Sequence, residues 1–416
     1  MTTAAPGTRI RYMGNKVALA QDVSAIVETV EPNRVLVDLF GGMCSVAGAV
    51  SRSGRHVWNN DIQHYAHLVA RCLLTSKVAP PSRDKAVRVL TSSYRFNLTA
   101  LRARFEEDLR IEREVLSRGS TSLYRETQGS WKHAGNDRAI GQEVARLRRR
   151  PSGPYRLATL TFAWGYFGLR QSIEIDSVRA AIDAADADQT LSSDEAAWCR
   201  LALLQSCSRV ASTPGHFAQF LRGEQPSSLR RILAARRRSV WDAVLDDLQH
   251  LSPFGNRKWR AGNRVLIADA LTIWRELDDA RLGPAVFYMD PPYSKEQYSR
   301  FYHVLETLAL YDYPDSSGAG RYRPDRFATP LATKSGVLAA TRTLLSAIAE
   351  RDGILLLSYP STGLLTSGLG IDMDALLGEY FAKVRLAIDI PSRHSTLGGR
   401  HGASRHEVLE YVWVAS

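Results

Sequence analysis

The stretch Ala285-Val286-Phe287-Tyr288-Met289, followed by Asp290-Pro291-Pro292-Tyr293, constrains the fold of this 416-residue chain more than any other. A short apolar run rich in β-branched and aromatic residues predicts a buried strand. Two consecutive prolines end that strand abruptly, because proline fixes φ and cannot donate a backbone hydrogen bond. The residues after the strand are therefore expected at the carboxyl edge of a sheet, where open α/β folds bind ligands.

The residues at that edge carry groups suited to a planar ring with an exocyclic amine. The Asp290 carboxylate and the Pro291 carbonyl can each accept one N–H, and the Tyr293 ring can stack on the flat face. A simple strand-ending turn is the alternative interpretation, because Pro-Pro pairs often mark loops.

Net charge and cysteine content narrow the classes of protein that fit. The formal charge of +11 suits a polyanionic partner, although basic surfaces also occur on proteins that bind no nucleic acid. The four cysteines show no metal-binding spacing, so no metal site is expected and the thiols fit a reducing compartment. There is no secretory segment and no apolar run of about 18 residues, so we expect a soluble, intracellular protein.

A second strand and turn, at Arg34 to Val46, predicts a ligand site near the amino terminus. The run Arg34 to Phe40 reads as a buried strand, and Gly41-Gly42 lets the backbone approach a ligand before a helix begins. A short strand at His56 to Asn59 ends at Asn60-Asp61, where an acidic side chain suits a ribose diol. The G-x-G-x-x-G pattern is missing, which disfavours a nicotinamide cofactor. The glycine turn and the acidic strand tip together indicate another ligand that contains adenosine.

Upstream lies Arg11-Tyr12-Met13-Gly14-Asn15-Lys16, followed by an amphipathic segment from Val17 to Val30. Gly14-Asn15 permits a tight turn, and Lys16 is expected near the start of a helix. A cation there opposes the helix dipole unless an anion lies nearby. An ordinary solvated lysine is the alternative.

In content and order, these four motifs resemble the Dam-like site-specific DNA adenine-N6 methyltransferases, over about the first 75 and the last 155 residues. The resemblance implies S-adenosylmethionine as cofactor and methyl transfer to N6 of an adenine flipped out of a specific double-stranded DNA sequence. It implies that Asp290, Pro291, Pro292 and Tyr293 form the catalytic motif. The family turn after the first strand carries G-x-G, where this chain has Gly41-Gly42-Met43.

The resemblance also implies the residues that contact the cofactor. These are Tyr12, Lys16, Asp38, Phe40, Gly41, Gly42, Asp61, Asp269 and Asp290. Asp269 falls where the family often contacts the cofactor adenine, and a helix N-cap before Leu271 to Trp274 is the alternative for this residue.

The middle of the chain differs in character, being rich in arginine clusters. The charged stretch Leu98 to Arg118 predicts a solvated helix. The aromatic and glycine-rich stretch Thr161 to Arg170 predicts either a small core or groups that stack on opened DNA. Family members carry their target-recognition region here, and the basic residues expected to bind DNA are Arg148, Arg149, Arg237, Arg257, Lys258, Arg393 and Arg400.

The predicted fold is a doubly wound, mostly parallel, Rossmann-like α/β methyltransferase sheet with an inserted, largely helical target-recognition domain. Residues 1–76 are expected to form the cofactor half, 77–260 the insertion and 261–416 the catalytic half. Later elements are predicted as a helix at Ser335 to Ala349 and strands at Arg264 to Asp269, Gly353 to Tyr359, Val384 to Ile390 and Glu407 to Val414.

The expected partner is double-stranded DNA, bound by a monomer in the prokaryotic cytoplasm at the nucleoid, with no membrane. The methylase is either an orphan or paired with a cognate restriction endonuclease. Cytosine-N4 methylation is the nearest alternative, although Ser more often than Asp opens that motif. RNA adenine methylation, protein glutamine methylation (which favours Asn) and a catalytically silent DNA-binding protein complete the alternatives.

Overall fold

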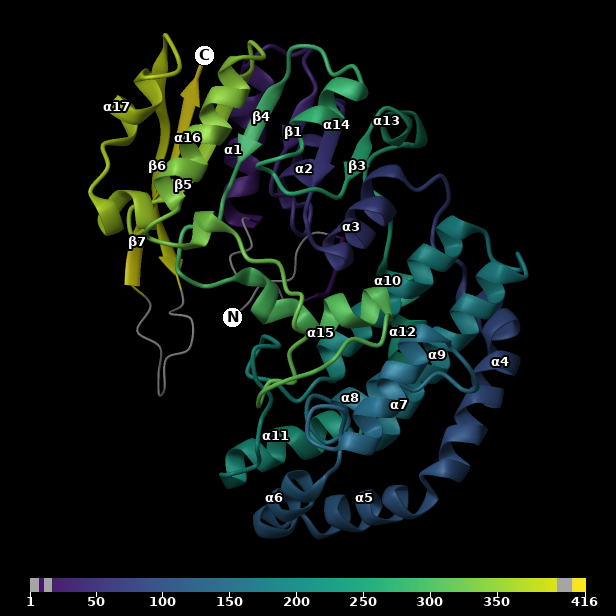
Figure 1. The fold of residues 1–416 in the computed structure, drawn as a ribbon. Coiled ribbons are helices and arrows are strands. Elements are labelled where there is room, and N and C mark those ends of the chain that lie inside the picture. The colour runs from purple at the N-terminus through teal and green to yellow at the C-terminus, as the bar shows by residue number, and fades with distance from the viewer. Residues whose placement is uncertain (1–6, 11–16, 395–405) are drawn as a thin grey trace. The chain divides into compact units, whose positions relative to one another are not determined.

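The computed structural model describes residues 7–10, 17–394 and 406–416, so Tyr12, Lys16 and Arg400 lie outside the described residues. The chain forms two compact units, each drawn from three segments (Figure 1). The unit here called the sheet unit comprises Gly14–Thr75, Phe254–Ser299 and Phe327–Ser416. The other, called the helical unit, comprises Met1–Met13, Ser76–Pro253 and Arg300–Arg326.

The sheet unit alternates strands with helices, as the predicted α/β class requires. Its strands are β1 (Leu36–Asp38), β2 (Val57–Asn60), β3 (Arg264–Leu266), β4 (Val286–Met289), β5 (Ile354–Pro360), β6 (Val384–His394) and β7 (His406–Ala415). Its helices are α1 (Val17–Thr29), α2 (Ser45–Val50), α3 (His64–Ala70), η1 (Arg71–Thr75), α13 (Arg257–Ala261), α14 (Trp274–Asp279), η2 (Pro330–Ala332), α16 (Val337–Ala349), η3 (Leu364–Gly368) and α17 (Met373–Gly378).

The described strands form one seven-stranded sheet in the order β3-β2-β1-β4-β5-β7-β6. Strands β1 to β5 pair in parallel, whereas β7 runs antiparallel to both β5 and β6. The chain runs outward from β1 through β2 to β3 and then returns to β4 on the other side of β1. The order of strands therefore reverses between β1 and β4, and open α/β sheets bind ligands outside the carboxyl ends of strands at such a point.

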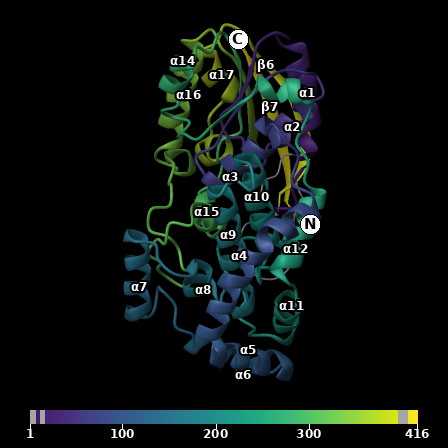
Figure 2. The same ribbon diagram turned by 90° about the vertical axis from the view of Figure 1, so that its right-hand side faces the viewer.

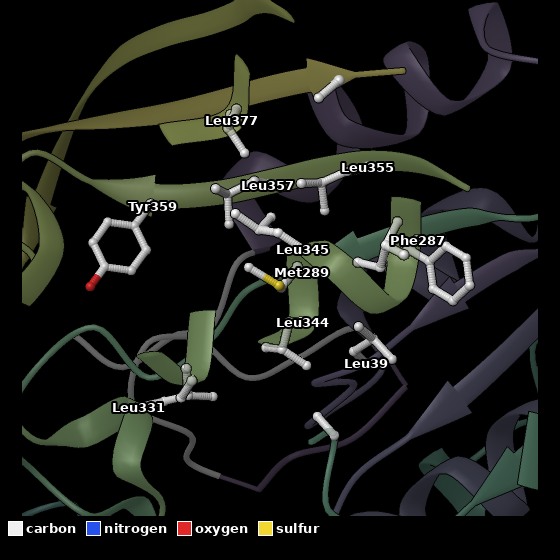
Figure 3. Packing of buried hydrophobic residues seen from close by; sticks show 14 of the residues in the cluster. Leu39, Phe287, Met289, Leu331, Leu344, Leu345, Leu355, Leu357, Tyr359 and Leu377 are labelled. Atoms are coloured by element: carbon white, nitrogen blue, oxygen red, sulfur yellow. The ribbon is translucent and has the colours of Figure 1, made fainter. Parts of the chain in front are cut away.

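One face of the sheet carries a continuous apolar core. The register aligns Val37, Phe287 and Leu355 across β1, β4 and β5, and aligns Met289 with Leu357 on the same face. Residues of α14, α16 and α17 belong to the same core cluster as these rows, and Figure 3 shows Leu344, Leu345 and Leu377 among the side chains of that cluster. Figure 2 places α14 and α16 on one side of the sheet and α1 and α2 on the other.

The strands and helices predicted for this unit are confirmed with shifts of a few residues at their ends. One strand is shorter than predicted: the strand that begins at Arg264 stops at Leu266 rather than continuing to Asp269. The chain turns there because Asn60 Oδ1 accepts the Ala268 N–H at 3.0 Å, a bond to a side chain from a different part of the sequence.

The helical unit contains the long middle segment of the chain. Its helices are α4 (Arg83–Arg104), α5 (Glu106–Arg118), α6 (Thr121–Ser130), α7 (Arg138–Arg149), α8 (Leu157–Phe162), α9 (Leu169–Ala187), α10 (Ser193–Val210), α11 (Pro226–Arg236), α12 (Val240–His250) and the larger part of α15 (Tyr298–Leu310). Several begin where a serine or aspartate accepts a backbone N–H from the first turn, as Ser82 does from Lys85 and Asp137 from Ile140.

The prediction of one solvated helix over Leu98 to Arg118 is wrong. The segment breaks at Phe105 into α4 and α5, and Leu98 and Leu101 are buried. Glu112 is only 4% exposed. Its buried carboxylate is satisfied by N–H groups that it accepts from Leu169 at 2.7 Å and Arg170 at 2.9 Å. This carboxylate therefore binds the free backbone N–H groups at the start of α9, a contact that the local charge pattern could not reveal.

The aromatic stretch at Thr161 to Arg170 belongs to the core of the helical unit. Phe162, Trp164, Tyr166 and Phe167 are each at most 1% exposed. The Tyr166 hydroxyl oxygen lies 2.7 Å from the Phe217 carbonyl oxygen and 2.9 Å from the Gly320 carbonyl oxygen, so its one O–H has two buried acceptors. Of the two interpretations of this stretch, burial supports a packed core.

No helix in the described ranges is both long enough and apolar enough to cross a membrane. The four cysteines are buried and form no disulfide with one another, so they act as small apolar groups in both cores.

Replacing Leu357 on β5 by alanine should lower the free energy of unfolding of the sheet unit by about 2–5 kcal/mol, because a buried cavity forms in the central row. Leu386→Ala on β6 is the matched control: this leucine is 42% exposed, and its removal should cost less than about 0.5 kcal/mol. Urea denaturation measures both. Equal destabilisation of the two variants would show that the β5 row is not the core.

Candidate active site

The glycine turn after β1 is tied to the end of β2. Gly41 N–H donates to the Asn60 carbonyl at 2.8 Å, and Gly42 N–H donates to Asp61 Oδ2 at 3.0 Å. Gly42 has φ +47° and Cys44 has φ +59°, so the chain passes twice through the left-handed region before α2 starts at Ser45. The turn predicted from Gly41-Gly42 is therefore held by the acidic residue predicted at the tip of the second strand.

Gly41 lies directly against the Asn59 side chain. A Cβ at residue 41 would lie 2.2–2.4 Å from the amide atoms of Asn59, so only glycine fits. Asn59 is 1% exposed, and in the part of the chain that the structure describes neither its Oδ1 nor its Nδ2 has a hydrogen-bond partner. A buried amide without partners, next to a backbone that no side chain covers, marks a place where a polar ligand can bind.

Asn60 holds three strand ends in place, a role that the sequence did not reveal. Its Nδ2 donates to the carbonyls of Leu39 at 3.1 Å and Ala268 at 3.0 Å. The only local signal was an Asn-Asn pair at the end of a strand, where asparagine is unusual.

Three carboxyl groups gather at the carboxyl ends of β1, β2 and β4. Burial is the main cause that raises the pKa of Asp38 to about 8, and the charges of Asp290 and Asp61 raise it further. The Phe40 N–H, 3.2 Å from Asp38 Oδ1, acts in the opposite direction. Asp61 is fixed separately, because its Oδ1 accepts the Gln63 N–H at 2.9 Å. Such a concentration of acidic groups suits a ligand that carries positive charge.

Asp290 to Tyr293 follow β4 at the point where the strand order reverses. Strands β1 and β4 remain joined up to this edge, because Leu39 N–H donates to the Tyr288 carbonyl at 3.1 Å. Pro291 is buried, and Asp290, Pro292 and Tyr293 are partly exposed. The Tyr293 carbonyl accepts the Leu364 N–H at 2.9 Å, and the ring packs on the core of the sheet unit.

The surroundings of Tyr293 include a carboxyl group that sequence reasoning missed. Burial chiefly raises the pKa of the Tyr293 hydroxyl, and the charges of Asp290 and Glu410 add to the shift. Glu410 on β7 is 3% exposed, in line with the buried residues Val408 and Val412. The signal available in the sequence was this alternation, which places a carboxylate on the buried face of a strand.

Asp269 closes a turn and does not cap α14. Its Oδ1 accepts the Leu271 N–H at 3.0 Å, and its carbonyl accepts the Thr272 N–H at 2.9 Å. Helix α14 starts later, at Trp274, with Ile273 in the N-cap position.

The basic residues predicted to bind DNA are divided between the two units. Arg149 and Arg237 are exposed in the helical unit, and Arg257 and Lys258 are exposed at the start of α13 in the sheet unit. Arg148, also predicted to bind DNA, is held by protein groups: its guanidinium donates to Asp315 Oδ1 at 2.5 Å and to the Tyr313 carbonyl at 2.8 Å. Arg393 lies in β6, but its side chain is outside the described part of the structure.

The fold is an open α/β sheet with glycine-containing and acidic turns at its switch point. Comparison with known proteins shows which family this chain is similar to. The model of the D12 class N6 adenine-specific DNA methyltransferases matches residues 12–107 and 275–337. These ranges include Asp38, Asp61 and Asp290, and the match confirms the resemblance predicted from the motifs.

Two curated relatives align with most of this chain. Modification methylase StsI of Streptococcus sanguinis is 23% identical over 375 residues, which is 89% of this chain and 46% of the relative. Type II methyltransferase M.FokI of Planomicrobium okeanokoites is 21% identical over 360 residues, which is 86% of this chain and 45% of the relative.

A third relative, type II methyltransferase M.NlaIII of Neisseria lactamica, is 25% identical over 219 residues, which is 52% of this chain and 57% of the relative. The chain thus spans about half the length of the curated relatives that it matches. No solved structure matches this chain significantly.

The raised pKa of Asp38 predicts how stability depends on pH without ligand. A carboxyl group whose pKa rises from 3.8 to about 8 on folding binds a proton more tightly in the folded state. Its contribution to stability is complete below pH 4 and is lost as pH rises through 8, by at most about 1.4 kcal/mol per pH unit. Asp38→Asn should remove this part of the slope in thermal melts between pH 5 and 9.

Asp279→Asn, on the exposed side of α14, is the control and should keep the slope of the parent protein. Parallel profiles for Asp38→Asn and the parent protein would contradict burial of the Asp38 carboxyl group.

Proposed function

We propose that this protein transfers a methyl group from S-adenosylmethionine to N6 of an adenine in a specific double-stranded DNA sequence. The observation that carries the proposal is the position of Asp290 and Pro291. They follow β4 at the point where the strand order reverses, beside the acidic turns of β1 and β2, in a chain that matches the adenine-N6 family.

The residues of the β1 and β2 turns fit the cofactor in charge and in space. S-adenosylmethionine supplies an activated methyl group on a positively charged sulfonium, and it carries an ammonium group as well. A cation near Asp38 would favour its ionised form and offset the cost of burying it. The Asn59 amide offers a donor and an acceptor beside a backbone without a Cβ at Gly41.

The residues proposed to hold the cofactor are those implied by the family motifs. They are Asp38, Phe40, Gly41, Gly42, Asp61, Asp269 and Asp290, together with Tyr12 and Lys16 outside the described residues. To these the structure adds Asn59, which no motif names.

Asp290 and Pro291 are proposed to act on the amine. The N6 lone pair of adenine is delocalised into the ring, so the nitrogen is a poor nucleophile. When the Asp290 carboxylate and the Pro291 carbonyl each accept one N–H, the nitrogen is drawn toward a pyramidal geometry with its lone pair directed away from the acceptors. The N–H becomes strongly acidic only as the new C–N bond forms, and Asp290 is then placed to take the proton.

Tyr293 is proposed to hold the target base by stacking. The N6 atom of a paired adenine cannot be reached inside the duplex, so the base must leave the stack. Pro292 fixes the backbone between the acceptor groups and the ring, which limits the motion of Tyr293 relative to Asp290.

Residues 77–260 are proposed as the target-recognition region, inserted between the cofactor half (1–76) and the catalytic half (261–416). Arg148, Arg149, Arg237, Arg257, Lys258, Arg393 and Arg400 are proposed to contact the DNA backbone. A prokaryotic cytoplasmic protein acting as a monomer, either alone or with a cognate restriction endonuclease, fits this proposal.

Asp290→Asn should lower the rate of methyl transfer by about 10²–10³-fold, because it replaces a charged acceptor that acts at the reacting nitrogen. The melting temperature should stay close to that of the parent. Tritium transfer from labelled S-adenosylmethionine to DNA measures the rate, and digestion of the product to nucleosides identifies N6-methyladenine. Asp279→Asn serves as the control.

Activity of Asp290→Asn within about tenfold of the parent would remove Asp290 from the role of amine acceptor. A product methylated at cytosine N4 would instead support the nearest alternative activity.

Tyr293→Ala should lose the fluorescence rise expected when 2-aminopurine replaces the target adenine and leaves its stacked neighbours. Stacking on an aromatic ring is worth roughly 1–3 kcal/mol per base, so Tyr293→Trp should keep much of the signal and some activity. Because the ring also packs on the core, melting curves of both variants are required. If a folded Tyr293→Ala variant flips and methylates like the parent, the ring serves packing alone.

A further inference from the structure

Arg321, in the helical unit after α15, is a buried cation that has no acidic partner among the described residues. It is 3% exposed, and its Nη1 donates to the carbonyls of Thr161 at 2.8 Å and Ala163 at 2.7 Å. The guanidinium lies over the Phe220 ring, 5.4 Å from its centre. Within the described ranges its Nε has no hydrogen-bond partner.

A second buried arginine lies close to Arg321. Arg236, also 3% exposed, donates through Nη2 to the Gly165 carbonyl at 3.1 Å and to the Tyr124 hydroxyl at 3.3 Å. Its Nη1 has no partner in the part of the chain that the structure describes. Gly165 lies so close to Arg321 that a Cβ there would be 3.0 Å from the Arg321 Cζ.

The charge of these arginines is expensive to bury. Burial is the main cause that lowers the pKa of Arg321 to about 10, and the charge of Arg236 lowers it further, so the side chain is still cationic at neutral pH. Buried charges are normally paired, because the desolvation of an unpaired one is not repaid. Bonds to Thr161 and Ala163 satisfy Nη1, but Nε is buried without a partner among the described residues, so these two carbonyls do not satisfy the whole side chain.

Arg321 lines a pocket of about 310 Å³ within the helical unit. Its charged lining consists of Arg125, Arg222 and Arg321 against the single carboxylate of Glu224. Arg125 and Arg222 are exposed at the rim and have no ion-pair partner among the residues that the structure describes.

The other polar groups of the pocket are compatible with an anion. Burial, followed by the charge of Arg321, lowers the pKa of His133 to about 3, so its ring is neutral. His133 Nδ1 accepts the Gly135 N–H at 3.1 Å. Gln128 Nε2 donates to the Trp164 carbonyl at 2.7 Å, which holds that amide to the core. The net positive charge of the pocket therefore comes from its three arginines.

We propose that this pocket binds a phosphate group of the DNA backbone. The guanidinium fork matches phosphate oxygens, and a partly buried site strengthens each charged hydrogen bond. The inference deepens the proposed function, on which it rests, because it names a backbone contact made by Arg125, Arg222 and Arg321. None of these three belongs to the arginine clusters expected from the sequence to bind DNA.

The test compares two double variants of the full-length protein. Arg125→Gln/Arg222→Gln removes the exposed cations of the pocket. Arg88→Gln/Arg95→Gln removes two exposed arginines of α4 in the same unit, outside the pocket, and so controls for net charge. Fluorescence anisotropy with a duplex oligonucleotide between about 50 and 200 mM salt gives the salt slope of binding.

The pocket variant should reduce the salt slope by about 1 for each phosphate group that the protein no longer neutralises, and the α4 control should keep the slope of the parent. Adding Arg321→Gln should reduce the slope further, provided that a melting curve shows the variant to be folded. If that variant does not fold, the pocket variant Arg125→Gln/Arg222→Gln decides the test. Equal slopes for the pocket variant and the α4 control would overturn the proposal.

Two more measurements separate the possible failures. Inorganic phosphate that raises the melting temperature of the parent but not of the pocket variant, with unchanged DNA slopes, would assign the pocket to free phosphate and overturn the DNA contact. A pocket variant with a reduced slope, in a protein whose parent methylates no adenine, would keep the phosphate site and reject the proposed function.

Discussion

Burial of the Asp38 carboxyl group at the end of β1 is the constraint on which the proposed ligand site of the sheet unit depends. The group lies where the strand order reverses, next to Asp61 and Asp290, so three acidic groups are crowded together in a poorly solvated place. A protein optimised for stability alone would replace such a carboxyl group. Retaining it makes sense where a positively charged ligand completes the site, which is the role that the proposed cofactor fills.

The rigidity of that site comes from backbone and amide contacts. Gly41 and Gly42 donate to the end of β2, and the Asn60 side chain joins β1 to the turn after β3. The acceptor groups after β4 are fixed by two prolines and by the Leu364 N–H bond to Tyr293. A site held in this way needs little reorganisation when charge develops, which is the physical basis of catalysis by preorganised dipoles.

In the helical unit, a buried carboxylate and two buried arginines differ in how fully they are hydrogen-bonded. The Asp176 carboxylate accepts hydrogen bonds from the backbone of Ala158 and Thr159 at 2.8 Å each and from the Tyr311 hydroxyl at 2.5 Å. Burial still raises the pKa of Asp176 to about 6, but its oxygens are well satisfied. Arg236 and Arg321 instead retain donors without partners in the described part of the chain. The carboxylate is satisfied within the protein, whereas the arginines still have donors to offer, and this difference supports the proposal of a phosphate site.

The sequence by itself determined the strands, their order along the chain and the residues placed at their carboxyl ends, because apolar runs, glycine turns and prolines act locally. The acidic turns, Asp290 to Tyr293 and the family resemblance could therefore be predicted. Only the tertiary structure decided that Glu112 caps a distant helix, that the aromatic residues near Trp164 are core, and that Asn59, Glu410, Arg236 and Arg321 are buried. Each of these features depends on residues that are far away in the sequence. A side chain loses its water only when the folded chain packs those distant residues around it.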